Sequence, residues 1–146
     1  MHNDSSNRAE VFSGLVPGDR FGPVEYHVSA TASDRYWQAA GIGHTARTAG
    51  FLYPPMAANL TILALQTVTP DPLLHTHQSL VCHRGVRAPA ILTVTGSVTG
   101  RFERRGRQYL KVAADLTTAD EPLWTSVATF VTAGDPDQHP ETGRDQ

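Results

Sequence analysis

The sequence has little cysteine and little net charge, and both scarcities narrow what the protein can be. Cys82 is the only cysteine among the 146 residues, so the chain forms no internal disulfide, which suits a reducing cytoplasm. Because Cys82 follows the apolar residues Leu80 and Val81, we expect a buried, unreactive thiol. Twelve Lys and Arg against 14 Asp and Glu give a formal net charge of −2. This balance supplies no strong field for nucleic acid or for an anionic membrane.

Long hydrophobic runs are also missing. No apolar stretch approaches the ~20 residues that span a bilayer, and the first six residues lack the basic and apolar segments of a secretory signal. We therefore expect a cytoplasmic protein with no membrane partner. A content of 40% hydrophobic and 18% charged residues is typical of a globular chain. We expect one domain over residues 11–133, with disordered polar ends at 1–10 and 134–146.

The first half of the sequence predicts one strand and two helices. Val24, Tyr26 and Val28 alternate with polar residues, which favours a half-buried strand. A short helix follows, with Thr31 or Ser33 as its N-cap and Gly41 at its end; a carboxylate at Asp34 then serves the helix N-terminal dipole. A loop over residues 42–53 precedes a second helix that runs from Pro54 to Thr67. That helix is apolar on most faces, so we expect it to be buried on all sides.

The second half is rich in strands. Short turns separate the strand-like stretches, which indicates an antiparallel meander. The stretches are residues 74–84, 90–100, 109–116 and 123–131. The predicted fold class is therefore α+β, with one apolar helix wrapped by a curved antiparallel sheet.

The order of these elements, together with three segments, resembles the MaoC-like hot-dog dehydratases and (R)-specific enoyl-thioester hydratases. The segments are Val28–Gly41, Gly50–Met56 and Leu74–Arg87, and the likeness covers about residues 15–133. The resemblance implies a hot-dog fold, a long central helix wrapped by the sheet, and activity on 3-hydroxyacyl or enoyl groups. Such groups are carried as thioesters on coenzyme A or acyl carrier protein, and the polyketide and other secondary pathways use them.

The sequence departs from that family at its catalytic motif. The hydratases carry Asp-x-Asn-Pro-x-His after the first helix, whereas this chain reads Gly41-Ile-Gly-His-Thr45. Ile42 stands where the family has aspartate, and His44 takes the place of the histidine. Gly85 and the pair Ala88-Pro89 replace further family residues.

His44 is the candidate catalytic acid or base, because imidazole exchanges protons near neutral pH. The alternative is a surface histidine in a loop.

His75 and His77 are two residues apart on a predicted strand, which places them on one face. We favour a pocket-lining role for these two histidines over a metal site, because no carboxylate or thiol lies at a metal-ligand spacing. Asn59 is the only amide within the apolar stretch of this helix and needs a partner if it is buried. The candidate substrate-binding residues are Tyr36, Tyr53, Met56, Ala57, Asn59, His75 and His77.

The resemblance further implies a backbone N–H at the start of the central helix that binds the thioester oxygen. Pro54 and Pro55 lack this group, so Met56 or Ala57 must donate. No metal and no organic cofactor is implied.

Three functions are open at this point. The first is a hydro-lyase acting on acyl thioesters, or a related cyclase or isomerase. The second is a non-catalytic hot-dog subunit that pairs with a catalytic chain, which Ile42 favours. A thioesterase is disfavoured, because residues 54–67 hold no carboxylate. In each case we expect a homodimer or a heterodimer with another hot-dog chain, joined through sheet edges.

A basic cluster remains outside these hypotheses. Arg101, Arg104, Arg105 and Arg107 surround Gly106, which indicates the solvated tip of a hairpin. The alternative is that these arginines bind a phosphate-bearing carrier.

Overall fold

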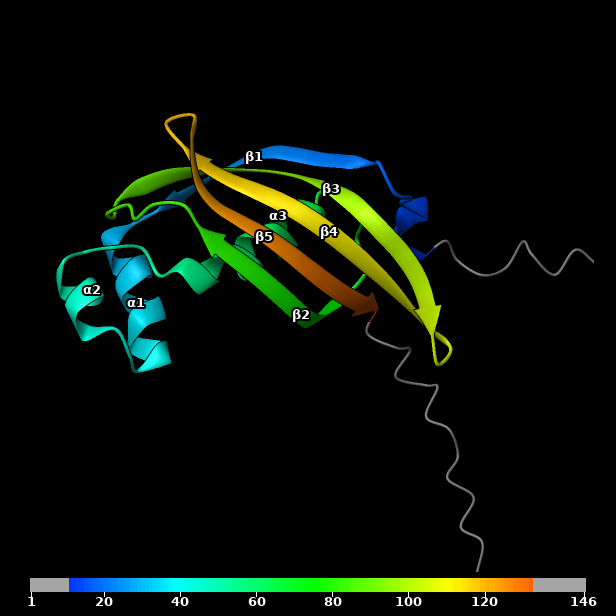
Figure 1. Ribbon diagram of the computed structural model, residues 1–146, viewed down its shortest axis with the longest axis horizontal. Helices are drawn as coiled ribbons and strands as arrows, with labels where there is room; N and C mark the ends of the chain where they lie inside the picture. Colours follow the sequence, from blue (N-terminus) through cyan, green and yellow to red (C-terminus); the bar gives the residue numbers. More distant parts are fainter. Residues whose placement is uncertain (1–10, 133–146) are drawn as a thin grey trace, which may run out of the picture.

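A computed structural model describes residues 11–132 of the chain (Figure 1). The predicted disordered ends, 1–10 and 134–146, lie outside the described residues. In chain order the elements are the 3-10 turn η2 (Val11–Gly14), β1 (Arg20–Val28), α1 (Ala30–Ala40), α2 (His44–Thr48), the 3-10 turn η3 (Pro54–Met56), α3 (Ala57–Leu65), β2 (Leu73–Cys82), β3 (Ala90–Arg104), β4 (Arg107–Thr118) and β5 (Glu121–Thr132).

The strands form one antiparallel sheet in the order β1-β3-β4-β5-β2. The meander of β3, β4 and β5 is as predicted, although each strand is longer than its apolar pattern indicated. The predicted place of residues 74–84 in that meander is wrong, because β2 pairs with β5 and not with β3. The hairpin between β3 and β4 turns on Arg105 and Gly106 alone, both with positive φ, a geometry that matches the twist of paired strands. The strands β1 and β2 form the two edges.

The hydrophobic core lies between α3 and the face of the sheet that covers it, which we call the inner face. Side chains alternate along the strands, so that Leu92 and Val94 of β3 and Leu110 of β4 are fully buried on this face. The helix contacts β1, β2, β3 and β5 and lies in the curve of the sheet (Figure 1). Burying each large apolar side chain contributes about 1.5–3 kcal/mol, so this contact fixes the helix on the sheet.

The predicted burial of α3 on all sides is wrong. Leu60, Ala64 and Leu65 are buried, but Leu63 is 49% exposed and Asn59 is exposed. A single curved layer covers one side of a helix, and no second layer of the described residues covers the other. The helix is also shorter than predicted, since Pro54–Met56 form a 3-10 turn and Gln66 follows its last residue.

The helix α1 begins earlier than predicted. Ser29 is its N-cap, and the Ser29 hydroxyl accepts a hydrogen bond from the Ala32 N–H at 3.1 Å. Thr31 and Ser33 therefore lie inside the helix, where the sequence had offered either as the cap. Gly41 ends the helix in the left-handed conformation with φ 68°, as predicted. The predicted loop after it contains the short helix α2.

The contact between β1 and β3 gives a matched test of the packing. A Cβ atom on Gly96 would lie 2.2 Å from Cζ of Phe21, a ring that is 2% exposed. A Cβ atom on Gly100 in the same strand would meet only Cβ of Lys111, at 3.6 Å. Gly96→Ala should therefore lower the free energy of unfolding by about 1–3 kcal/mol, the usual cost of overpacking. Gly100→Ala should change it by less than about 0.5 kcal/mol. Urea denaturation of both variants measures this, and equal losses would contradict the contact.

Candidate functional site

The indole of Trp37 joins α1 to the segment that leads into α3. Its Nε1 donates a hydrogen bond to the Phe51 carbonyl at 2.7 Å, and the side chain is 7% exposed. Gly43 lies against the ring so closely that a Cβ atom there would come 2.3 Å from Trp37. Residues before α3 are also held to the loop after β2, because the Leu52 N–H donates to the Val86 carbonyl at 2.9 Å. Trp37 thus fixes the position of the α1–α2 pair.

A second link between α1 and α2 is the ion pair of Asp34 and Arg47. The Nε and Nη2 atoms of Arg47 donate to the two Asp34 oxygens at 2.5 and 2.9 Å. The hydrogen bond from Arg47, together with its charge, lowers the pKa of the Asp34 carboxyl. Asp34 therefore does not serve the helix dipole as the sequence indicated, because Ser29 places it in the second turn of α1. Since the pair is exposed, it orients the two helices more than it stabilises them.

Three of the predicted substrate-binding residues come together where α1 meets the start of α3. The rings of Tyr36 and Tyr53 stack with centroids 6.2 Å apart, and Trp37 meets Tyr53 edge-on at 4.9 Å. Asn59 Nδ2 donates to the Tyr36 hydroxyl at 3.3 Å. Asn59 is exposed, so it needs no buried partner. A phenol and an amide therefore stand side by side at the open side of α3, where both can bind a polar ligand group.

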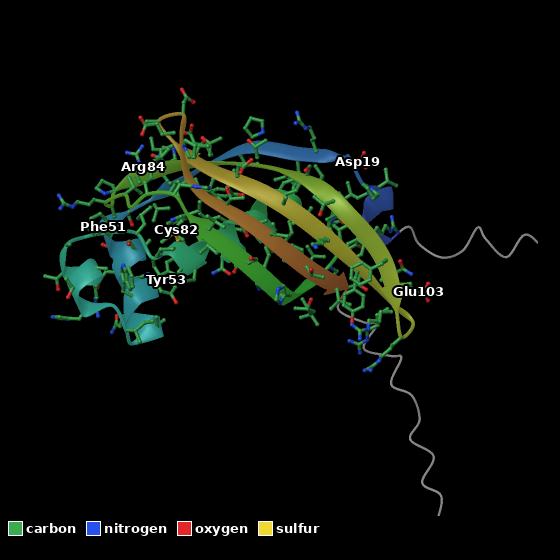
Figure 2. All side chains as sticks on the ribbon, viewed as in Figure 1. Asp19, Phe51, Tyr53, Cys82, Arg84 and Glu103 are labelled. Carbon is green, nitrogen blue, oxygen red and sulfur yellow. The ribbon has the colours of Figure 1, made fainter. Side chains whose placement is uncertain are left out.

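A groove of about 340 Å³ adjoins this cluster through Trp37. Its walls are mostly apolar. The lining residues are Trp37, Ala46, Phe51, Leu52, Pro54, Cys82, His83, Arg84 and Gly85. Figure 2 shows Phe51, Tyr53, Cys82 and Arg84 at the same end of the molecule. A concave apolar surface with a few polar groups is typical of a small-molecule site.

The thiol of Cys82 is exposed, which corrects the prediction of a buried one. Cys82 is the last residue of β2, an edge strand, and its cross-strand partner is Trp124. The apolar neighbours Leu80 and Val81 do not indicate burial here, because an edge strand leaves even apolar residues in solvent. Val81 itself is 54% exposed.

The predicted thioester-binding donors are already engaged. The Met56 N–H donates to the Tyr53 carbonyl at 3.1 Å, and the Ala57 N–H donates to the carbonyls of Pro54 and Pro55. Both side chains are buried in the core. The oxyanion role implied for Met56 and Ala57 therefore has no support in this geometry.

The candidate catalytic residue, His44, is exposed in the first turn of α2. No hydrogen bond or ion pair links its side chain to another of residues 11–132. Ile42, which stands in the place of the family's aspartate, is 67% exposed. The catalytic role of His44 stays a prediction.

His75 and His77 do not share a face of β2. A bulge at Thr76 separates them, since His75 pairs with Phe130 and His77 with the next residue, Thr129. An extra residue in a strand reverses the alternation of its side chains. His75 therefore faces the inner side, with its ring 5.4 Å from that of Phe130, and His77 faces the outer side. The predicted shared face is wrong.

Comparison with known proteins gives a structural likeness. Neither a protein-family model nor a curated protein matches the sequence. The HadBC (3R)-hydroxyacyl-ACP dehydratase complex of Mycobacterium tuberculosis superposes with a TM-score of 0.67 at 16% identity, over 80% of this chain and 96% of that one. A MaoC-like dehydratase from Rhodospirillum rubrum gives 0.60 at 18% identity, over 84% and 96%. The (R)-hydratase of A. caviae involved in PHA biosynthesis gives 0.63 at 16% identity, over 84% and 98%.

The chain has the hot-dog fold. This likeness and the five-stranded sheet curved around α3 confirm the fold that the sequence predicted.

The hot-dog sheet also carries polar groups on its outer face that sequence reasoning missed. His83 Nε2 and Thr125 Oγ1 are hydrogen-bonded at 2.8 Å, and Thr125 Oγ1 donates to Asp115 Oδ1 at 3.2 Å. Arg84 pairs with Glu121 beside them, along a groove of about 600 Å³. In the sequence, the sign of this cluster is the polar residues at alternate positions of β4 and β5. Only the strand register shows that Asp115 lies opposite Thr125.

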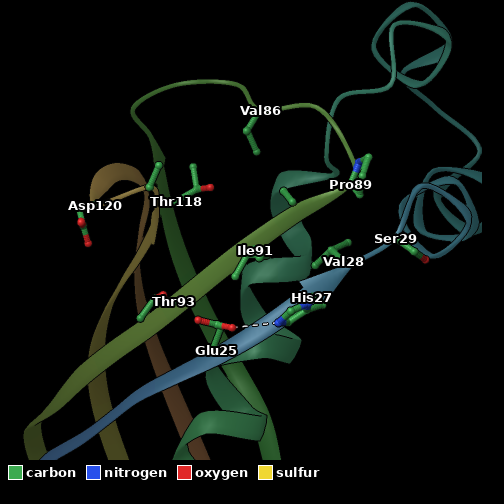
Figure 3. A pocket seen from close by; sticks show the side chains of 12 residues that line it. Glu25, His27, Val28, Ser29, Val86, Pro89, Ile91, Thr93, Thr118 and Asp120 are labelled. Carbon is green, nitrogen blue, oxygen red and sulfur yellow. Dashed lines mark hydrogen bonds and ion pairs between the residues drawn. The ribbon is translucent and has the colours of Figure 1, made fainter.

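A larger groove of about 850 Å³ follows the outer side of β1 and β3. Figure 3 shows its floor at Ile91, the linked side chains of Glu25 and His27, and Asp120 across from them. Nε2 of His27 lies 2.9 Å from Glu25 Oε1, and both side chains are well exposed.

Within residues 11–132, no three His, Cys, Asp or Glu side chains gather as metal ligands. No helix in that range is long and apolar enough to cross a membrane.

The packing of Gly43 on Trp37 can be tested with Gly41, a second glycine of the same loop, as the control. Gly41 and Gly43 both have positive φ, so alanine costs backbone strain of roughly 1–2 kcal/mol at either position. Only at Gly43 does the new Cβ displace Trp37. Gly43→Ala should shift the Trp37 indole N–H resonance in a ¹H–¹⁵N spectrum, and Gly41→Ala should leave it in place. The Trp124 indole is the internal reference, and an unmoved Trp37 signal in Gly43→Ala would contradict the contact.

Proposed function

We propose that the chain is a cytoplasmic acyl-thioester hydro-lyase whose single domain spans residues 11–133. It hydrates enoyl groups, or dehydrates 3-hydroxyacyl groups, carried on coenzyme A or acyl carrier protein. The observation that supports this function best is the apolar groove beside α1, whose wall residue Trp37 also contacts the Tyr53 ring of the Tyr36–Asn59 cluster. Two structural neighbours, a (3R)-hydroxyacyl-ACP dehydratase and an (R)-hydratase, point to the same kind of reaction.

The groove suits an acyl chain bound by its hydrocarbon part. Trp37, Phe51 and Leu52 offer apolar walls, and each square ångström of hydrocarbon removed from water contributes about 25 cal/mol. The phenol of Tyr36 and the amide of Asn59 are donors for the thioester carbonyl oxygen. They replace the backbone donors that Met56 and Ala57 do not supply.

In the proposed reaction His44 carries the proton. In the dehydration direction its neutral imidazole removes a proton from C2, the C2=C3 double bond forms, and the C3 hydroxyl takes that proton and leaves as water. Hydration is the reverse, with water adding to C3 and a proton to C2. Without the family's aspartate, one imidazole performs both proton transfers, and we expect slow turnover.

Hydration of crotonyl-coenzyme A tests this role, measured as loss of the enoyl absorbance. His44→Ala should lower kcat by about 10²- to 10⁴-fold, the usual contribution of a general acid or base. His27→Ala is the control, since His27 is an exposed histidine on the outer side of β1. Equal rates for the wild type and His44→Ala, zero included, would remove His44 from the proposal.

The second candidate function is a non-catalytic subunit that supplies an acyl groove to a catalytic hot-dog partner. Ile42 favours it, because an exposed isoleucine replaces the acid that the resemblance expects. The edge strand β2 also favours it: Leu74 and Val81 are more than half exposed on its outer side. A long edge with apolar side chains is a surface for pairing, and two structural neighbours, HadBC and ChsH1-ChsH2, are complexes.

Size-exclusion chromatography and co-purification separate the two functions. For a non-catalytic subunit, the chain should turn over no enoyl thioester alone and should co-purify with a second hot-dog chain that bears an intact Asp-x-Asn-Pro-x-His. Val81→Lys should then weaken the association, because a charge on an edge strand opposes pairing. This function would be excluded if the chain is a monomer at high concentration, binds no such partner, and elutes at the same volume with and without Val81→Lys.

A further inference from the structure

An exposed aromatic pair lies at the hairpin end of the sheet, on the outer face. Phe102 of β3 and Tyr109 of β4 are cross-strand partners. Their rings are parallel within 2° and their centroids are 5.0 Å apart. Phe102 is 42% exposed, whereas phenylalanine is among the residues most often buried. An exposed flat ring is a platform on which a second planar group can stack.

Cationic side chains surround this pair on the same face. Arg104 and Arg107 are direct cross-strand partners, and they lie two residues from Phe102 and Tyr109, so they share the outer face. Lys111 lies two residues beyond Tyr109 on that face, opposite Gly100. Like charges placed directly opposite in a sheet are destabilising. A bound anion would neutralise that repulsion.

The acidic group of the hairpin faces the other way. Glu103 lies between Phe102 and Arg104 and so faces the inner side, where Gln108 Nε2 donates to its carboxylate at 3.1 Å. Arg104, Arg105 and Arg107 form no ion pair with another of residues 11–132. The outer face of the hairpin is therefore positive although the whole chain has a net charge of −2.

The bulge in β2 completes a groove beside these residues. It turns His77 to the outer face, opposite Thr129, and the groove between this edge and the hairpin measures about 430 Å³. Phe102, Tyr109, Arg104, Arg105 and His77 line it together. Small-molecule sites have volumes of about 300–1,000 Å³, so a mononucleotide fits this size class.

We propose that this groove binds a phosphorylated nucleotide, with the base stacked on Phe102 and the phosphates held by Arg104 and Arg105. Stacking on an aromatic ring suits any nucleobase, and guanidinium groups bind phosphate oxygens in pairs. An acidic protein segment would use the cations and leave the aromatic pair without a role. A long nucleic acid would need cations beyond the hairpin.

This site is separate from the acyl groove and goes beyond the proposed function. The acyl groove adjoins α1 and α2 at one end of the molecule, and the hairpin lies at the other, as the labels of Phe51 and Glu103 show (Figure 2). Phe102 lies twelve positions beyond Ala90 along β3, a path of roughly 40 Å at about 3.3 Å per residue.

Isothermal titration of the full chain with ADP tests the site, with adenosine and inorganic phosphate as the partial ligands. The wild type should bind ADP at least 10-fold more tightly than either. Phe102→Leu, which keeps an apolar side chain but loses the ring, should weaken ADP binding about 10-fold, the scale of one stacking contact. Phe102→Tyr should restore it. Arg105→Ala should weaken ADP binding and leave adenosine binding unchanged.

Arg20→Ala is the matched control, an exposed arginine on β1, and should bind ADP as the wild type does. Urea denaturation checks that each variant folds. Failure of the wild type to bind ADP would overturn the proposal, and so would equal affinity for ADP and phosphate, which indicates a site for anions alone. Binding of an acidic peptide in place of ADP would overturn it too. Turnover of enoyl thioesters by the Phe102 variants is measured separately, so that the two proposals fail independently.

Discussion

The packing of α3 in the curve of the sheet is the contact on which the other features depend. One side of the helix is apolar and fully covered by inner-face residues of the strands, and this burial supplies most of its stability, since a nine-residue helix does not persist alone in water. The helix in turn fixes the segment before it. The positions of Tyr53, the 3-10 turn and the Phe51 carbonyl all follow from where α3 begins.

The candidate acyl site results from the incomplete covering of that helix. The sheet covers one side, while α1 and α2 cover only the approach to its first turn. Trp37 links the two parts through its hydrogen bond to Phe51. The groove lies beside this link, and Tyr36, the neighbour of Trp37 in α1, forms a polar pair with Asn59. The uncovered side of α3 is therefore a consequence of having a single sheet, and it leaves both tyrosines accessible.

Much of the fold could be predicted from the sequence, because alternation marks the strands and an apolar run marks α3. The site could be predicted only in part. Tyr36, Tyr53 and Asn59 do meet, but the bulge at Thr76 that separates His75 from His77 has no marker in the residues around it. The exposure of Cys82 depends on β2 being an edge strand, which local sequence does not specify. The outer-face chain from His83 to Asp115 depends on the register of three strands.

The most direct test of the account is to locate a bound acyl thioester by ¹H–¹⁵N spectroscopy. Butyryl-pantetheine is a suitable probe, because it has no double bond or 3-hydroxyl to react and carries no nucleotide. We expect saturable shifts of the Trp37 indole N–H and of the backbone amides of Cys82 and Gly85, which line the groove. Unchanged signals at these three positions, with shifts confined to the outer face of the sheet, would contradict it.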